Sequence, residues 1–423
     1  MSSALIIAAP GSGNGKTTVT LGVLRALRDA GVTVRGAKSG PDYIDPRFHE
    51  AACGHPCPNL DAWAMNRERL VSLAAGEGLL LIEGAMGLFD GAPPEGRGAT
   101  ADLARLLGVP VVLVVDCSHM AQSVAALVRG FVDHDPDVRV VGLILNKIGS
   151  SRHEAMLRRA LEPVAVPVLG AIYRQEGLTH PSRHLGLVQA SEHPDIQTYL
   201  QDAAQIVAAS VDLDRLAGLG APLPTPGPRP AFPPPAQVIS IARDEAFAFA
   251  YPHLLQDWRA AGAELSFFSP LADEAPQTCD LVFLPGGYPE LHAGRLSHAA
   301  RFRDAMRAAA QTGQVYGECG GYMVLGRQLT DAQGVAHRML GLLPLETSFE
   351  TRSLHLGYRA LNPLGGPFSG PLFGHEFHYA TTLHAEGPAL FEARDAEGIG
   401  LTPMGLRHGS VSGSFAHVID QAN

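Results

Sequence analysis

The chain has 423 residues, of which 46% are hydrophobic and 17% are charged, and its formal net charge at pH 7 is −10. This length predicts two or three domains, and the composition is typical of a well-packed globular protein. The acidic balance, with no run of basic residues, disfavours nucleic acids and acidic membranes as partners. A locally positive pocket could still bind a small anion.

The sequence lacks the signs of a secreted or membrane protein. Its five cysteines are an odd, scattered set, unlike a disulfide framework. The N-terminus leads directly into an apolar run at 4–9 without a basic segment before it, and no run of 18 or more apolar residues follows. We therefore expect a cytoplasmic protein. A homodimer is compatible with the sequence, which does not determine the oligomeric state.

Short apolar runs alternate with amphipathic stretches in the first half of the chain. Strands are predicted at 4–9, 78–84, 110–116 and 138–146, and helices at 17–31 and 100–108. This alternation predicts an α/β fold in which a parallel sheet carries helices on both faces.

A proline-rich segment, APLPTPGPRPAFPPPA at 221–236, interrupts this pattern. Such a sequence forms neither a helix nor a central strand and is typical of an extended linker. We therefore predict one domain at 1–220 and a second at 237–423. The second also starts as α/β, with strands predicted at 236–242, 263–268 and 279–287, and becomes richer in strands after Gly334.

The first predicted strand leads into a glycine-rich loop that opens a helix. The loop, PGSGNGKTT at 10–18, is a variant of the phosphate-binding P-loop with proline in place of the usual first glycine. Its backbone N–H groups and Lys16 would hold the ATP phosphates, and Thr17 would bind Mg²⁺. The predicted ATP-binding residues are Gly11, Ser12, Gly13, Asn14, Gly15, Lys16, Thr17 and Thr18, with Asn146 as a candidate for adenine recognition.

Two further loops place acidic residues at the ends of predicted strands, beside the P-loop. In KSGPDYIDP, Lys38 would hold a phosphate or a substrate carboxylate, although a solvated turn is the alternative interpretation. In EGAMGLFDG, Glu83 is placed as a Walker-B acid would be. We assign the metal to Thr17, Asp45 and Glu83, and the substrate to Lys38, Asp42, Tyr43 and Asp90.

The second half contains a cysteine between glycines, in YGECGGYMVLG at 316–326. A strand, a Gly-x-Cys-x-Gly turn and a helix form a nucleophile elbow, so Cys319 is the predicted nucleophile. We expect the helix N-terminus to lower the thiol pKa, and the backbone N–H groups of Gly287 and Gly320 to form an oxyanion hole. The spacing does not choose a base among His375, His378 and His417. Cys53, Cys57 and His119 are interpreted as structural.

These motifs, in this order, closely resemble the cobyrinic acid a,c-diamide synthase family of cobalamin biosynthesis. The resemblance implies a dethiobiotin-synthetase-like ATPase domain joined to a class I glutamine amidotransferase domain. It implies Cys319 as the glutaminase nucleophile and His417 as its base. Most class I amidotransferases have a glutamate where this chain has Ile419, so a dyad is expected. The segments that match are APGSGNGKTT, KSGPDYIDPRFH, EGAMGLFDG, LPGGYPELH, YGECGGYMVLG, GHEFHY and GSFAH.

The resemblance implies amidation of the a and c acetates of a corrinoid polycarboxylate, with ATP, glutamine and Mg²⁺. Hydrogenobyrinic acid, cobyrinic acid and nickel sirohydrochlorin are alternative substrates, and the Ala-, Arg- and Pro-rich composition slightly favours metal-free hydrogenobyrinic acid. A further alternative is that the protein is an amidoligase that acts on an unrelated polycarboxylate. The alternative of a different class is a regulatory P-loop ATPase with a relic amidotransferase tail. It is disfavoured because Gly11 occupies the place of the extra lysine that switch ATPases carry.

Overall fold

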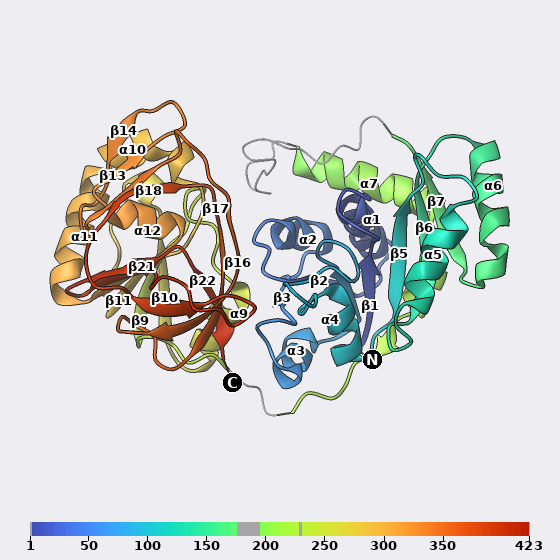
Figure 1. Ribbon diagram of the computed structural model, residues 1–423, viewed down its shortest axis with the longest axis horizontal. Coiled ribbons are helices and arrows are strands. Elements are labelled where there is room, and N and C mark those ends of the chain that lie inside the picture. Colours follow the sequence, from blue (N-terminus) through green and yellow to red (C-terminus); the bar gives the residue numbers. More distant parts are fainter. Residues whose placement is uncertain (1, 176–194, 228–230, 423) are drawn as a thin grey trace. The chain divides into compact units, whose positions relative to one another are not determined.

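The computed structural model describes residues 2–175, 195–227 and 231–422, and the chain divides into two compact units, Met1–Pro230 and Ala231–Asn423. Each unit has its own sheets (Figure 1). The ends of the predicted proline-rich linker pack into the units: 221–222 pairs with the first strand, and Phe232 is buried in the second unit. Residues 228–230 of this linker lie outside the described residues.

The sheet of the first unit has the order β3-β2-β4-β1-β5-β6-β7, and all of these neighbours are parallel. Its central strands are buried because their residues are apolar on both faces. The strands are β1 (Ser3–Ala8), β2 (Val34–Ser39), β3 (Asn59–Leu60), β4 (Leu79–Glu83), β5 (Val111–Asp116), β6 (Val140–Ile148), β7 (Val168–Tyr173) and β8 (Ala221–Pro222), which is antiparallel to β1.

Helices flank this sheet, and α1 packs closely on α7 (Figure 1). Gly22 of α1 allows this approach, because a Cβ atom there would lie 2.5 Å from Cγ2 of Val207. The helices are α1 (Lys16–Asp29), α2 (Asp45–Cys53), α3 (Arg67–Ala74), α4 (Thr100–Leu107), α5 (Val124–Asp133), α6 (Ser151–Leu161), α7 (Ile196–Ser210) and α8 (Leu213–Gly218).

The strand order reverses at β1, which lies between β4 and β5. The chain leaves β1 for β2 on one side and later crosses to β5 on the other. In open α/β sheets, ligands bind at the carboxyl ends of the strands at such a reversal. The loops after β1, β2 and β4 carry the three motifs of the predicted ATP site, so the fold brings these motifs together. The predicted α/β class is confirmed.

The second unit is built on a sheet of order β10-β9-β11-β12-β21-β20, in which only β20 among these strands is antiparallel to its neighbour. Most of the described strands after Gly334 belong to two smaller sheets, β14-β13-β15-β18 and β19-β16-β17-β22, as the β-rich sequence predicts, while β20 and β21 complete the main sheet. The strands are β9 (Val238–Ala242), β10 (Glu264–Phe268), β11 (Leu281–Leu284), β12 (Gln314–Glu318), β13 (Gln328–Thr330), β14 (Ala336–Arg338), β15 (Leu345–Ser348), β16 (His355–Pro363), β17 (Leu372–His378), β18 (Thr381–Ala385), β19 (Phe391–Arg394), β20 (Leu406–His408), β21 (Val411–Ser414) and β22 (His417–Gln421).

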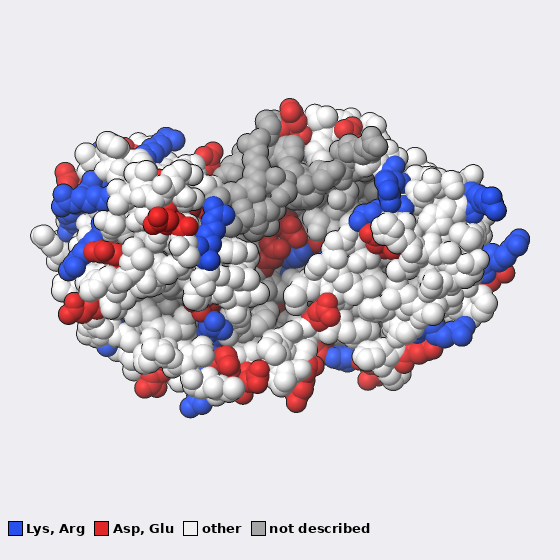
Figure 2. All heavy atoms as spheres, turned by 45° about the horizontal axis from the view of Figure 1, so that its top comes forward, with Lys and Arg blue, Asp and Glu red and all other residues white. Residues whose placement is uncertain are grey.

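The helices of this unit cover an apolar core that includes Phe302, Met306 and Tyr322. They are α9 (Pro252–Ala260), α10 (Ala293–His298), α11 (Ala300–Thr312) and α12 (Gly320–Leu325). On the face shown in Figure 2, acidic and basic side chains are interspersed over the units. Among the described residues, no helix has the length and apolar character needed to cross a bilayer.

Candidate active sites

The P-loop ends where α1 begins, at Lys16, and its glycines are required by its shape. Gly13 and Gly15 have φ angles of 80° and 83°, in the left-handed region that side chains disfavour. A Cβ atom on Gly15 would also overlap the amide nitrogen of Asn146. The loop therefore adopts the tight turn that the GxGK pattern predicts.

The side chains of two predicted ATP-binding residues, Asn14 and Asn146, form hydrogen bonds that stabilise the P-loop. Asn14 accepts a hydrogen bond from the backbone N–H of Asp116 through Oδ1, at 2.9 Å. Asn146 donates from Nδ2 to the carbonyl oxygen of Asn14, also at 2.9 Å. Lys147 donates to the carbonyl oxygen of Gly13. These bonds hold the loop to the ends of β5 and β6.

A pocket with a volume of about 660 Å³ lies beside the P-loop. This volume is within the range of small-molecule sites, and lysine side chains on its wall suit an anionic ligand. The residues that line it are Gly13, Gly15, Lys16, Thr17, Thr18, Val19, Ile44, Asp45, Ser118, Asn146, Lys147, Ile172, Tyr173, Arg174, Gln175, Ala203, Ile206 and Val207.

Lys38 joins the acidic loops that follow β2 and β4. Its Nζ lies 2.5 Å from Oδ2 of Asp45 and 2.8 Å from Oε1 of Glu83. The Thr17 hydroxyl donates to the same oxygen of Glu83 at 2.7 Å. The three predicted metal ligands, Thr17, Asp45 and Glu83, therefore meet around one buried ammonium group.

The charges of this cluster stabilise one another. Burial alone would lower the pKa of Lys38, but Asp45 and Glu83 raise it well above its ordinary range. Burial alone would raise the pKa of Glu83, but Lys38 and a hydrogen bond from His49 hold it well below its usual range. Burial lowers the pKa of Lys16, while Glu83 opposes this effect. Lys38 and Glu83 are thus held as an ion pair.

Asp42 lies at the edge of the cluster, with its carboxylate 3.9 Å from Nζ of Lys38. It accepts backbone hydrogen bonds from Ile44 and Asp45, which shape the turn before α2. The surrounding loop removes water from its carboxyl and Asp45 repels the charge, so that its pKa is raised to about 6. Tyr43 follows in the same turn.

His49 is a site residue that the sequence reasoning missed. Its Nε2 lies 2.6 Å from Oε2 of Glu83, and both side chains are fully buried. Its Nδ1 lies 3.5 Å from Sγ of Cys57, which is consistent with the structural role predicted for that cysteine. A usable signal was present, because Asp45 and His49 are four residues apart on α2 and therefore share a face.

The loop after β4 lies against the P-loop. A Cβ atom on Gly87 would lie 2.6 Å from the carbonyl oxygen of Pro10. The carboxylate of Asp90 accepts a hydrogen bond from the backbone N–H of Gly87 at 2.9 Å. Asp90 is exposed. It therefore holds its own loop in shape and still faces solvent near the phosphate site.

Cys319 lies in a sharp turn between β12 and α12. Its φ and ψ angles are 48° and −105°, a strained conformation that is typical of a nucleophile elbow. Its backbone N–H donates to the carbonyl oxygen of Ser414 at 2.8 Å, which ties the turn to the end of β21. The side chain is almost fully buried.

The helix N-terminus acts on the Cys319 thiol in the predicted direction, but it does not lower the pKa overall. Burial raises the pKa of Cys319 well above its ordinary range, and Glu290 adds to the rise. The N–H of Gly320 acts in the opposite direction but is outweighed. The six residues of α12 form a short helix with a correspondingly weak dipole. The thiol therefore needs a base to remove its proton.

Gly286 lies next to the side chains of both His417 and Cys319. A Cβ atom on Gly286 would overlap the His417 ring and would lie 3.1 Å from its Nε2 and 3.3 Å from Cβ of Cys319. Burial lowers the pKa of His417 to about 3, with smaller contributions from His375 and His378. The imidazole is therefore neutral at rest and able to accept a proton. Gly286, the first glycine of the LPGG motif, keeps the space between the two groups open.

The two predicted oxyanion donors lie side by side. A Cβ atom on Gly320 would lie 3.0 Å from the backbone nitrogen of Gly287. A Cβ atom on Gly287 would overlap the carbonyl oxygen of Ala246, so glycine at both positions allows these backbone segments to pack closely. Two neighbouring backbone N–H groups beside the cysteine are compatible with an oxyanion hole.

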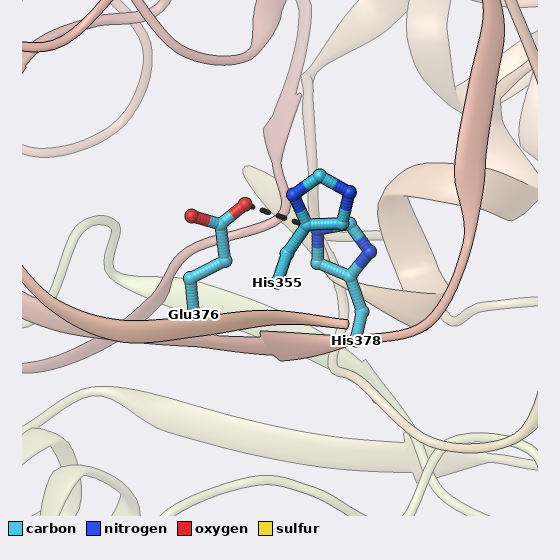
Figure 3. Close-up of side chains that lie close together, drawn as sticks. All are labelled: His355, Glu376 and His378. Carbon is cyan, nitrogen blue, oxygen red and sulfur yellow. Dashed lines mark hydrogen bonds and ion pairs between the residues drawn. The ribbon is translucent and has the colours of Figure 1, made fainter. Parts of the chain in front are cut away.

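His375 and His378 lie on β17, near His417. His375 lies opposite His417 in the strand register. His378, Glu376 and His355 form the cluster drawn in Figure 3, and their ligand atoms lie within 4.8 Å of one another. The Glu376 carboxylate is already paired with Arg359 at 2.7 Å. We therefore interpret the cluster as a hydrogen-bonded charge network rather than a metal centre.

Two family models match the chain, one in each half. Residues 5–188 match the CobQ/CobB/MinD/ParA nucleotide binding domain, and residues 238–423 match the CobB/CobQ-like glutamine amidotransferase domain. Curated relatives named hydrogenobyrinate a,c-diamide synthase match almost the whole chain. Three of them come from Brucella anthropi (57% identical, 98% of each chain), Sinorhizobium sp. (55%, 99% of each chain) and Rhodobacter capsulatus (52%, 98% of each chain).

Proposed function

Because this chain belongs to the hydrogenobyrinate a,c-diamide synthase family, we propose that it amidates the a and c acetate carboxylates of hydrogenobyrinic acid. It is a ligase that forms amides with glutamine as the nitrogen donor. The relatives' names favour the metal-free substrate over cobyrinic acid and nickel sirohydrochlorin. Their similarity extends over both units, which favours a ligase over a regulatory ATPase with a relic tail.

The observation that carries this proposal is the presence of two complementary sites in one chain: a P-loop with a carboxylate cluster, and a buried cysteine beside a neutral histidine. The first can activate a carboxylate and the second can release ammonia. Neither site alone makes an amide from glutamine. We further propose that the enzyme works in the cytoplasm, where ATP and glutamine are supplied. That two copies of the chain form a homodimer stays a prediction.

In the glutaminase site, the thiol of Cys319 gives its proton to Nε2 of His417. The sulfur electron pair attacks the side-chain carboxamide carbon of glutamine, and the backbone N–H groups of Gly287 and Gly320 stabilise the oxyanion. The C–N bond breaks as His417 returns the proton to the leaving nitrogen, which departs as ammonia. Water then hydrolyses the thioester, which gives glutamate and restores the thiol.

In the ligase site, an acetate oxygen of the substrate attacks the γ-phosphorus of ATP, and ADP leaves. Lys16 and Lys38 are placed to stabilise the negative charge of the transferred phosphoryl group. Ammonia then attacks the acyl carbon and inorganic phosphate leaves, which gives the amide. Activation is needed because a free carboxylate is a poor electrophile.

The oxygen atoms around Lys38 fit a magnesium ion. The Thr17 hydroxyl and the Asp45 and Glu83 carboxylates are the hard ligands that Mg²⁺ prefers; hydrogen bonds join Thr17 to Glu83, and both carboxylates to the Lys38 ammonium group. When bound, the ion would neutralise charge on the nucleotide phosphates. Asp42 lies at the edge of this cluster, and we propose that Asp42, Tyr43 and Asp90 contact the corrinoid.

A substrate panel tests this proposal. The purified protein is given ATP, Mg²⁺ and glutamine with hydrogenobyrinic acid, cobyrinic acid or nickel sirohydrochlorin, and amidation is read by mass spectrometry. We expect hydrogenobyrinic acid to be converted fastest, to a diamide. Cys319→Ala should lose conversion with glutamine and keep it with ammonia. Preference for another tetrapyrrole would contradict the substrate, and glutamine-driven conversion by Cys319→Ala would contradict the mechanism.

A further inference from the structure

Glu318, the residue before the nucleophile, carries a buried carboxyl beside the catalytic histidine. Its Oε2 lies 3.7 Å from Nδ1 of His417, and its side chain is 4% exposed. The position where most class I amidotransferases have their acidic third residue is occupied here by Ile419, which is apolar and fully buried. A carboxyl therefore reaches the histidine from a different strand, β12, instead of from β22.

The other oxygen of Glu318 is held by two donors. The Tyr316 hydroxyl donates to Oε1 at 3.1 Å, and the backbone N–H of Val418 donates to the same atom at 3.1 Å. Burial and the neighbouring carboxyl raise the pKa of Tyr316 well above its ordinary range, so it stays a donor. Because both donors occupy Oε1, the Oε2 atom is left to face the imidazole.

We propose that Glu318 is the positioning residue of the glutaminase site and completes a Cys319–His417–Glu318 triad. Across this separation of 3.7 Å, its carboxylate favours the tautomer with the proton on Nδ1 of His417, so that the lone pair of Nε2 can take the thiol proton. This inference rests on the glutaminase function proposed above. It replaces the expected dyad with a triad whose acid comes from the nucleophile's own strand.

The proposed triad also explains how the positive charge that forms on His417 during catalysis is stabilised. When Cys319 gives up its proton, His417 becomes an imidazolium in a site where burial strongly disfavours it. A carboxylate at Glu318 stabilises that cation. Burial raises the pKa of Glu318 to about 8, so its ionised form increases as the pH rises toward that value. The other titratable groups facing the pair are Glu290, Glu376, His375 and His378.

Glu318→Gln tests this role with little change in shape. The amide oxygen can still accept the bonds from Tyr316 and Val418, so the fold should be kept. The amide nitrogen, in the place of Oε2, would donate to Nδ1 of His417 and force the ring proton onto Nε2. In that tautomer the ring cannot accept the thiol proton, the effect that Asp→Asn produces in a serine protease triad.

We expect Glu318→Gln in the full-length enzyme to lower kcat for glutamate release by about 10²–10⁴-fold, with the KM for glutamine unchanged. The rise of kcat/KM with pH through about 8 should disappear. Amidation driven by ammonia should be unchanged. Glu264→Gln, an exposed glutamate on β10 of the same sheet, is the matched control and should behave as the wild type.

A wild-type kcat and pH profile in Glu318→Gln would overturn the inference. So would a loss of glutaminase activity that is matched by a fall in unfolding temperature, because that result indicates a purely structural role. Failure of the proposed function gives a different pattern: the wild type would release no glutamate, or Cys319→Ala would still release it.

Discussion

Lys38 shows how a single side chain organises the ligase site. Its ammonium group contacts the carboxylates of Asp45, at the start of α2, and Glu83, at the end of β4, and is itself buried. His49 binds the second oxygen of Glu83. Breaking one partner of such a buried network leaves a charge without compensation, which costs about 3–5 kcal/mol. The cluster is therefore a structural requirement in addition to its proposed role in phosphate binding.

The lowered pKa of Glu83 predicts how the free energy of unfolding depends on pH. Its pKa is lowered from 4.5 in the folded state, so its stabilising effect is present above that pH and is lost as the pH falls below it. The pKa of Lys38 is raised from 10.5, so its contribution is complete below pH 10.5 and is lost above it. The free energy of unfolding of wild type relative to Glu83→Gln should be largest between these limits.

Urea unfolding of both proteins at a series of pH values measures this difference. Arg307→Met is the control, because it removes an exposed ion pair with Asp304 and should change stability by at most about 1 kcal/mol at any pH. A gap between wild type and Glu83→Gln that stays constant down to strongly acidic pH would show that Glu83 is not held as a carboxylate.

At the scale of elements, Gly286 in the LPGG loop after β11 leaves space for the ring of His417. Gly286→Ala would place a methyl group on the His417 ring. We expect this variant to lose most glutamate release while ammonia-driven amidation continues, because the displaced ring no longer reaches Cys319. Gly294→Ala is the control, since its Cβ atom would only make an ordinary contact with His337 at 3.7 Å. Equal glutaminase rates for the two variants would contradict this geometry.

The close packing of α1 on α7 gives a second prediction at this scale. Gly22→Ala would place a Cβ atom 2.5 Å from Val207 and 2.7 Å from the carbonyl oxygen of Ala203. We expect a loss of about 1–3 kcal/mol in unfolding free energy, because overpacking outweighs the helix propensity of alanine. Gly130→Ala in α5 has nothing within 4 Å and should stabilise the protein by up to about 1 kcal/mol. Chemical denaturation of both variants should therefore give shifts of opposite sign.

At the scale of the whole molecule, we expect that mutations can separate the ligase activity from the glutaminase activity. Lys16→Ala removes the P-loop ammonium and should abolish amidation from either glutamine or ammonia. Because Cys319 and His417 belong to the other unit, glutamate release should retain a measurable rate in this variant. The assay compares glutamate release with amide formation in the same sample. Amidation of the substrate by Lys16→Ala with added ammonia would refute the assignment of the P-loop.

Much of the fold could be predicted because its signals are local. The apolar run at 4–9, the helix that opens at Lys16 and the turn at Cys319 each need particular residues within a few positions. The pairing of β17 with β22 could not be predicted, because it joins residues far apart in the chain. That pairing is what places His375 opposite His417.

The sequence by itself determined the P-loop turn and the strained turn at Cys319, because left-handed glycines and a strand-to-helix elbow are conformational demands of short segments. Only the tertiary structure decided which groups surround them: His49 on Glu83, Glu318 beside His417, and the raised pKa of Cys319. The physical reason is that burial and electrostatic interactions depend on distance in space. Residues that are far apart along the chain, such as Glu318 and His417, become neighbours only when the strands pack.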